Sequence, residues 1–230
     1  MRLREDGEVI PPRAFIAGAE RLGLIEQIDR YVIRRAVAVL ADSTREPARY
    51  HVNLAGPSVL DPGLPAYLTA EIGARGVDPR RLTFEIAESV VSADAEAVRR
   101  FARSLHDLGC GLALDDVCAG FGFFSYLRDV PVQFLKIDGS LVSALGASRN
   151  DRVLVKAIID AAHGMDMRTI AEHVGSEETR RLLARCGADY GQGYYLGIPQ
   201  RIAEGEADPQ PGGKRCPACP DGGSPPGEMP

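Results

Sequence analysis

Short hydrophobic runs alternate along this chain with longer segments of helical periodicity. The runs are rich in Val, Ile, Leu and Phe, and their nearly continuous apolar character is typical of strands that are buried on both faces. Together they predict an α/β fold in which a parallel sheet is covered by helices. The six runs are Tyr50–Leu54, Leu82–Ile86, Gly111–Leu114, Phe134–Ile137, Arg168–Ala171 and Tyr190–Tyr195.

The segments between the runs carry helix signals. The segment Ala93–Leu108 is followed by Gly109, a helix stop signal, and carries apolar residues at helical spacing. It is therefore predicted to be a helix with one buried face. Spread over about 200 residues, the strand–helix pattern favours a (β/α) barrel, with a doubly wound open sheet as the alternative. The other predicted helices are Val153–Met165, Glu177–Cys186 before Gly187, and Pro12–Ala41 as two helices broken near Gly23.

Composition and charge narrow the function classes. The 230 residues are 45% hydrophobic, which is sufficient for a full core. The net charge of −5 gives no general attraction to a nucleic acid polymer or an anionic membrane, so an anionic substrate must be held locally. No apolar run reaches the ~20 residues of a membrane segment, and the charged start is unlike a signal peptide. We therefore expect a cytoplasmic protein.

The C-terminal residues 204–230 differ in composition from residues 1–203. They contain six Gly and seven Pro, which predicts a disordered tail after a folded domain of residues 1–203. Cys216 and Cys219 form a single CxxC pair in this tail. One pair is at most half of a structural zinc site, so an incidental dithiol is favoured over zinc binding or redox chemistry. The five cysteines are too scattered for a disulfide framework.

Polar residues lie at the end of every predicted strand. In a parallel barrel the carboxyl ends of all strands share one rim, so we expect these side chains to converge there. Crowded carboxylates repel one another unless cations lie between them. Oxygen donors favour Mg²⁺ or Mn²⁺ over zinc, and adjacent acids could bridge two such ions. The residues are Asn53, Glu85, Asp115, Asp116, Lys136, Asp138, Glu172 and Gln192.

Each of these residues also has a purely structural interpretation. A single acid at a strand end is most often a helix cap or a solvated loop residue, and Asp138 is placed to cap the segment Gly139–Leu145. Glu88 could begin a turn. Lys136 is the least ordinary of the set, because lysine is rare in buried strands. The histidines at positions 51, 106 and 163 are interpreted as ordinary core or surface residues.

Several motifs in one register resemble the EAL domain family of cyclic di-GMP phosphodiesterases. The resemblance runs from about Gly7 to Pro199, and the motifs are highly specific in combination. It implies a modified TIM barrel that hydrolyses cyclic di-GMP to the linear dinucleotide with two Mg²⁺ or Mn²⁺ ions. The motifs are IPPRAFIAGAERLGLI, HVNL, LTFEIAES, LALDD, FLKID, TIAEHV and YGQGYYLGIP.

The resemblance also assigns roles to the strand-end residues. It implies that Asn53, Glu85 and Asp115 bind the first metal, and that Asp115 bridges to a second metal bound by Asp116 and Glu172. Lys136 would hold the catalytic water, and either it or Glu172 would assist deprotonation. Gln192 and Asp138 would contact the substrate. Glu88 would anchor the loop that follows the paired aspartates.

The chain departs from the family pattern in three places. The Glu-Ala-Leu strand would fall just before Met1, so the barrel is expected to lack its first strand and one metal ligand. The segment Val117–Phe123 stands where the family has a sequence close to Phe-Gly-Thr-Gly-Tyr-Ser-Ser. Ala171–Gly175 reads AEHVG where the family has Ala-Glu-Gly-Val-Glu. His173 therefore replaces a glycine at a position where a close backbone approach or positive φ is expected.

These departures predict impaired hydrolysis. Two explanations of the absent strand stay open: a start site placed too late in a longer gene product with a sensor or cyclase domain upstream, or a naturally shortened member. The alternative function is a non-catalytic receptor for cyclic di-GMP or a protein-interaction scaffold. A third interpretation is a TIM-barrel metalloenzyme for another phosphorylated substrate. A homodimer is also expected from the resemblance.

Overall fold

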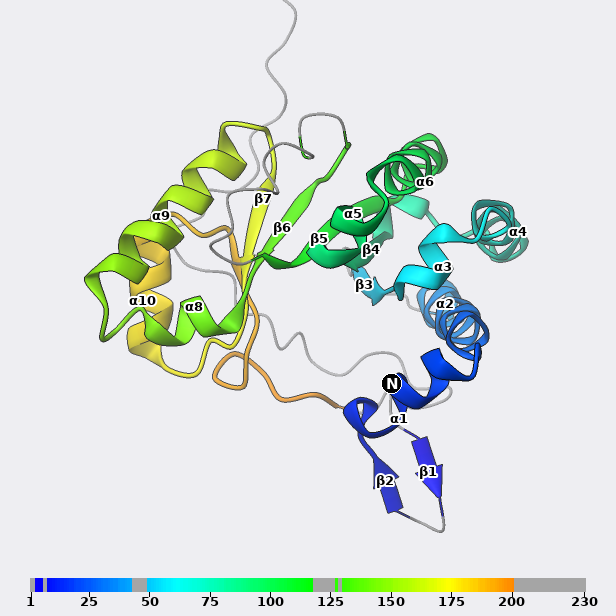
Figure 1. The fold of residues 1–230 in the computed structure, drawn as a ribbon, viewed down its shortest axis with the longest axis horizontal. Coiled ribbons are helices and arrows are strands. Elements are labelled where there is room, and N and C mark those ends of the chain that lie inside the picture. Colours follow the sequence, from blue (N-terminus) through cyan, green and yellow to red (C-terminus); the bar gives the residue numbers. More distant parts are fainter. Residues whose placement is uncertain (1–2, 6–7, 43–48, 118–126, 128–129, 201–230) are drawn as a thin grey trace, which may run out of the picture. The chain divides into compact units, whose positions relative to one another are not determined.

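The computed structural model describes residues 3–5, 8–42, 49–117, 127 and 130–200. The chain divides into two compact units, Met1–Leu135 and Lys136–Arg201, and each is described by itself (Figure 1). Six strands share one sheet in the order β3-β4-β5-β6-β7-β8, and β1 and β2 form a separate two-stranded sheet. No helix of the described residues has the length and apolar character needed to cross a bilayer.

The first unit begins with a small antiparallel hairpin and continues into alternating helices and strands. The predicted break near Gly23 is confirmed, because Gly23 lies between α1 and α2 with a φ of 66°, a conformation that glycine adopts without steric cost. The elements are β1 Leu3–Glu5, β2 Glu8–Ile10, α1 Pro12–Arg21, α2 Ile25–Asp42, β3 Tyr50–Asn53, α3 Gly56–Leu60, α4 Leu64–Arg75, the 3₁₀ turn η1 Pro79–Arg81, β4 Leu82–Ala87, α5 Glu88–Ala93, α6 Ala95–Leu108 and β5 Gly111–Val117.

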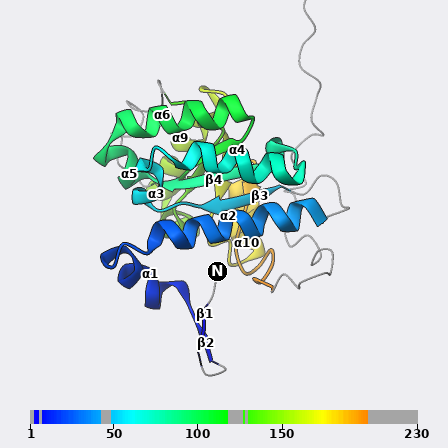
Figure 2. The ribbon, with the colours of Figure 1, turned by 90° about the vertical axis from the view of Figure 1, so that its right-hand side faces the viewer.

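Helices α2, α4 and α6 lie side by side along one face of β3, β4 and β5 (Figure 2). The side chains of Phe84 on β4 and Leu112 on β5 are almost completely buried, with 0% and 1% of their surface exposed. The predicted apolar face of α6 is also buried, with Phe101 and Leu105 3% and 1% exposed. Removal of these side chains from water is the main source of stability in this unit.

The three strands of the first unit are parallel and in a defined register. Asn53 pairs with Glu85, and Asp115 pairs with Ala87. Ile86 of β4 and Leu114 of β5 line a pocket together with Val91 of α5, and because side chains alternate between the faces of a sheet, the other even-numbered residues of these strands share that face. The odd-numbered residues face the opposite side, so the register fixes which polar side chains are neighbours there.

The second unit comprises the end of β6, three helices and two strands. Helices α9 and α10 pack against each other (Figure 1), and β7 pairs in parallel with β8. Asp189, which directly precedes β8, is joined to β7. Its carboxylate accepts hydrogen bonds from the backbone N–H and the hydroxyl of Thr169 at 2.8 and 2.9 Å. The elements are β6 Phe134–Ile137, α8 Gly139–Ala144, α9 Arg149–His163, β7 Arg168–Ala171, α10 Glu177–Cys186 and β8 Tyr190–Gly191.

The differences from the predicted boundaries have local causes. The helix predicted at 93–108 begins instead at Ala95, as α6. Asp94 is its N-cap residue, whose side chain accepts a hydrogen bond from the Ala97 N–H at 2.9 Å. Ser148 caps α9 in the same way, so this helix begins before the predicted Val153. The last strand is two residues long rather than six. The predicted tail at 204–230 lies outside the described residues.

Candidate metal centre

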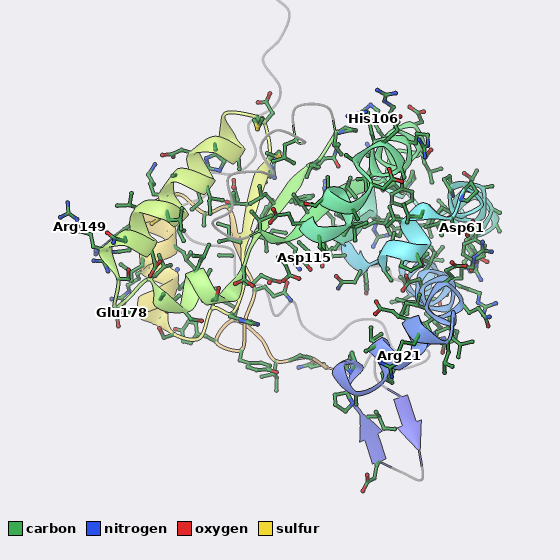
Figure 3. All side chains as sticks on the ribbon, viewed as in Figure 1. Arg21, Asp61, His106, Asp115, Arg149 and Glu178 are labelled. Atoms are coloured by element: carbon green, nitrogen blue, oxygen red, sulfur yellow. The ribbon has the colours of Figure 1, made fainter. Side chains whose placement is uncertain are left out.

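Three oxygen donors of the first unit lie on one face at the carboxyl ends of adjacent strands. Asn53 ends β3 and is the register partner of Glu85 on β4. Asp115 lies on β5 two residues beyond Ala113, the partner of Glu85, and therefore faces the same side. Figure 3 labels Asp115 at this end of β5. The register thus brings Asn53, Glu85 and Asp115 to neighbouring strand ends, although Asn53 and Asp115 are 62 positions apart in the sequence. Their role as metal ligands stays a prediction.

Glu85 is the buried member of this set, with 4% of its surface exposed. A buried carboxylate requires hydrogen-bond partners or a cation. One partner is His51, whose Nδ1 lies 2.8 Å from Glu85 Oε1. The interpretation of the sequence gave His51 no role at this site. Its position two residues before Asn53, and hence on the same face, was the available signal.

The paired aspartates mark a turn in the backbone at the end of β5. Asp116 has a φ of 56°, a left-handed conformation that aspartate tolerates better than most residues. Its backbone N–H donates a hydrogen bond to Asp115 Oδ1 at 3.0 Å. Asp116 lies inside β5, one residue before its end at Val117, and carboxylate oxygens of Asp115 and Asp116 lie within 4.8 Å of each other. The altered loop that follows lies, beyond Val117, outside the described residues.

Lys136 and Glu172 form an ion pair in the second unit. Lys136 Nζ lies 2.9 Å from Glu172 Oε1, and their side chains are 3% and 15% exposed. The Glu172 backbone N–H donates to the carbonyl of Ile137 at 3.1 Å, which fixes the end of β7 beside the end of β6. A buried ammonium group is tolerated here because a carboxylate accompanies it. The unusual lysine noted in the sequence thus has a carboxylate partner at the strand ends.

The two predicted substrate contacts have different surroundings. Asp138 caps α8, since its Oδ1 accepts hydrogen bonds from the Ser140 backbone N–H at 2.9 Å and from the Ser140 hydroxyl. The capping interpretation is therefore confirmed. Gln192 is exposed, and its backbone bridges Ala171 and Val174 with hydrogen bonds of 2.8 and 2.9 Å. A substrate contact by either side chain stays a prediction.

His173 has a backbone conformation suited to glycine, as the family resemblance predicted. Its φ is 52°, and L-residues with a side chain adopt this region at a cost. Its imidazole ring lies against Gly139, where an added Cβ would be 2.7 Å from the ring Cε1. The expected positive φ is therefore present directly after Glu172, and the imidazole of His173 occupies the space beside Gly139.

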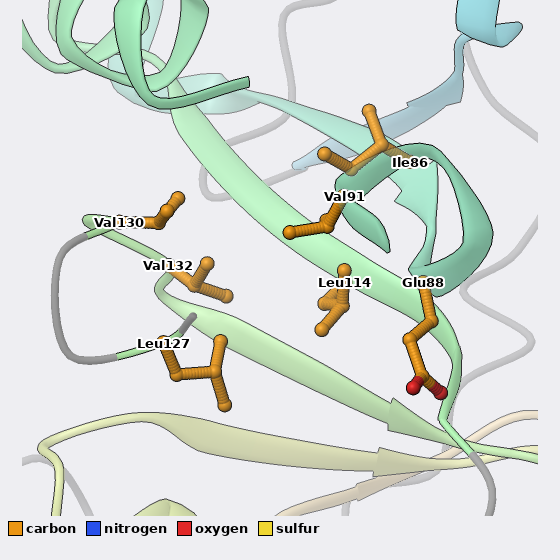
Figure 4. Close-up of a pocket in the computed structure, with 7 residues that line it drawn as sticks. All are labelled: Ile86, Glu88, Val91, Leu114, Leu127, Val130 and Val132. Atoms are coloured by element: carbon orange, nitrogen blue, oxygen red, sulfur yellow. The ribbon is translucent and has the colours of Figure 1, made fainter. Parts of the chain in front are cut away.

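Glu88 is one of the residues that line a small, mostly apolar pocket of the first unit (Figure 4). It is the first residue of α5. Ile86 and Leu114, which line the pocket, face the opposite side of the strands from Glu85 and Asp115. Anchoring of the neighbouring loop by Glu88 stays a prediction, because that loop is outside the described residues. The remaining lining residues are Val91, Leu127, Val130 and Val132.

The donor set fits a hard divalent cation. Amide and carboxylate oxygens at strand ends suit Mg²⁺ or Mn²⁺, whereas zinc sites are usually rich in His and Cys. A parallel α/β sheet with such donors at the carboxyl ends of its strands defines the class of TIM-like α/β proteins with a candidate metal centre at the strand ends.

The EAL domain family matches residues 1–199. The chain belongs to this family. It is 34% identical over 206 residues to the cyclic di-GMP phosphodiesterase PdeB of Shewanella oneidensis and 31% identical over 202 residues to PdeF of Escherichia coli. These alignments cover 88% and 87% of this chain but 24% and 27% of the relatives, so the chain spans about a quarter of their length.

Solved EAL domains share the fold. The FimX EAL domain of Pseudomonas aeruginosa bound to c-di-GMP superposes with a TM-score of 0.82 at 30% identity, covering 90% of this chain and 84% of that chain. The PaMucR phosphodiesterase in complex with c-di-GMP gives a TM-score of 0.81 at 28% identity, covering 86% and 82%. The predicted α/β, TIM-like fold of the EAL type is therefore confirmed.

Proposed function

We propose that this EAL domain binds cyclic di-GMP and hydrolyses one of its phosphodiester bonds to give the linear dinucleotide. The observation that carries the proposal is the alignment of Asn53, Glu85 and Asp115 on one face of three adjacent strands. Oxygen donors so placed suit divalent ions that act on phosphodiesters. The family assignment adds support, because the named relatives PdeB and PdeF are cyclic di-GMP phosphodiesterases.

The donors are assigned to two Mg²⁺ or Mn²⁺ ions. Asn53, Glu85 and Asp115 would hold the first ion, and Asp115, Asp116 and Glu172 the second. When bound, such ions activate water and neutralise the charge that develops on the phosphate. The left-handed conformation of Asp116 supports this division. In a regular strand, two consecutive residues would point their carboxylates to opposite faces of the sheet.

Lys136 and Glu172 are assigned to the attacking water. The ammonium group of Lys136 would donate a hydrogen bond to the water, and its ion pair with Glu172 fixes the position of both groups. Glu172 would then accept a proton as the water attacks the phosphorus and the sugar oxygen leaves. Gln192 and Asp138 remain candidates for contact with the nucleotide.

Turnover is expected to be slow, and a non-catalytic cyclic di-GMP receptor is the second candidate function. The observation that favours it is His173, which places an imidazole at φ 52° directly after Glu172. A homodimer and a preceding sensor or cyclase domain are further predictions from the family.

The proposal is tested with purified protein, cyclic di-GMP and Mn²⁺. Chromatography measures conversion to the linear dinucleotide, and titration calorimetry measures binding. We expect Asp115→Asn to lower turnover by at least about 100-fold, because it removes a charge that stabilises the transition state through the ions. Asp107→Asn, on the exposed surface of α6, is the control and should leave turnover unchanged.

The outcomes separate the candidates. Conversion that is lost in Asp115→Asn and kept in Asp107→Asn supports the phosphodiesterase. Binding of cyclic di-GMP without conversion supports the receptor. Neither heat of binding nor conversion, with or without Mn²⁺, would overturn both.

A further inference from the structure

His51 makes a contact with the buried carboxylate of the candidate metal centre. Its Nδ1 lies 2.8 Å from Glu85 Oε1, a normal hydrogen-bond distance. A carboxylate that binds a cation is ionised and can only accept hydrogen bonds, so in the metal-binding state the ring nitrogen would be the donor. The side chains of His51 and Glu85 are 27% and 5% exposed, so the hydrogen bond is partly buried.

The direction of this hydrogen bond follows from the register. His51 pairs with Thr83, whereas Glu85 pairs with Asn53. The hydrogen bond therefore runs diagonally between the two neighbouring strands, and it involves one carboxylate oxygen of Glu85, Oε1.

The imidazole ring is itself held in place. It makes an edge contact with the ring of Phe134, with centroids 5.3 Å apart and planes inclined at 66°, a favourable aromatic geometry. In the sheet, β4 and β5 lie between the strands of these two residues, so the sheet must curl toward this face. Phe134 thus limits the rotamers that His51 can adopt.

We propose that His51 is a positioning residue that sets the orientation of Glu85 for binding of the first divalent ion. A Glu side chain has three rotatable torsions, and ordering it on metal binding costs conformational entropy. The hydrogen bond from His51 removes part of that cost before the ion arrives, and hydrogen-bonded partners of ligands commonly tune metal affinity in this way. The inference rests on the proposed function, because it requires Glu85 to be a ligand.

The test measures Mn²⁺ affinity directly, with free Mn²⁺ followed by electron paramagnetic resonance and without nucleotide. His51→Phe keeps an aromatic ring against Phe134 but has no donor. His51→Asn keeps an N–H donor near the Nδ1 position. The matched control is His106→Phe, because His106 is exposed on α6 (Figure 3). Circular dichroism checks the folding of each variant.

We expect His51→Phe to weaken Mn²⁺ binding by about 10- to 100-fold, His51→Asn to restore affinity to within about threefold of the original protein, and His106→Phe to have no effect. A folded His51→Phe variant with unchanged Mn²⁺ affinity would refute the inference. An equal loss in His51→Asn and His51→Phe would also refute it, since a donor-independent role is then indicated.

If His51→Phe does not fold, His51→Leu takes its place with the same expected result. Absence of Mn²⁺ binding by the unaltered protein would instead refute the metal centre of the proposed function, and this inference with it.

Discussion

The contact between Gly139 and His173 allows a double-mutant test of the second unit. A Cβ at position 139 would overlap the imidazole of His173, with the ring Cε1 at 2.7 Å. Real Cβ contacts are essentially never shorter than 3.0 Å, so the ring must move if Gly139 becomes alanine. Replacing His173 by glycine removes the ring and also relieves the backbone at φ 52°.

The expected free energies of unfolding follow from these contacts. Gly139→Ala alone should destabilise by about 1–3 kcal/mol, as overpacking usually does. His173→Gly alone should be close to neutral, because relief of a left-handed residue worth roughly 1 kcal/mol is offset by the greater freedom of glycine in the unfolded chain. In the His173→Gly background Gly139→Ala should be neutral or stabilising by up to about 1 kcal/mol. The coupling energy is therefore about 2 kcal/mol.

Urea unfolding of the four proteins, followed by far-ultraviolet circular dichroism, measures this coupling. The m-values should agree, so that shifts of the midpoint report stability. If the two substitutions are additive within about 0.5 kcal/mol, the ring does not restrict position 139 and the reasoning fails.

Two further predictions concern carboxylates that accept several hydrogen bonds. Asp29→Ala should destabilise the first unit by about 2–4 kcal/mol, because Asp29 accepts hydrogen bonds from the Ala55 N–H and the Ser58 hydroxyl at 2.8 and 2.6 Å; an effect below about 1 kcal/mol in urea unfolding would contradict this. Burial is the largest influence on the pKa of Asp189 and acts to raise it, but the hydrogen bonds from Thr169 and His163 together lower the pKa below its ordinary 3.8. The stabilisation from ionised Asp189 is thus complete above that value and is lost as the pH falls through the lowered pKa. The stability difference from Asp189→Asn should shrink over that acidic range, and a constant difference would refute the assignment.

The sequence determined the secondary structure and the fold class because these depend on nearby residues. Phe134–Ile137 and Arg168–Ala171 are strands with the predicted bounds. Gly109 and Gly187 end their helices with φ values of 88° and 90°, where a glycine was the local signal. The polar residue at the end of each apolar run could also be identified from the sequence, which is why Asn53 was expected at a strand end.

The tertiary structure decided which of those polar residues meet. The pairing of Asn53 with Glu85 depends on a register between strands that no local pattern specifies. The ion pair of Lys136 with Glu172 and the hydrogen bond of His51 to Glu85 join residues far apart in the chain. Asp138 could have been a ligand or a cap, and only the position of Ser140 resolved its capping role. Side-chain direction and long-range neighbours arise from packing, which a single sequence does not display.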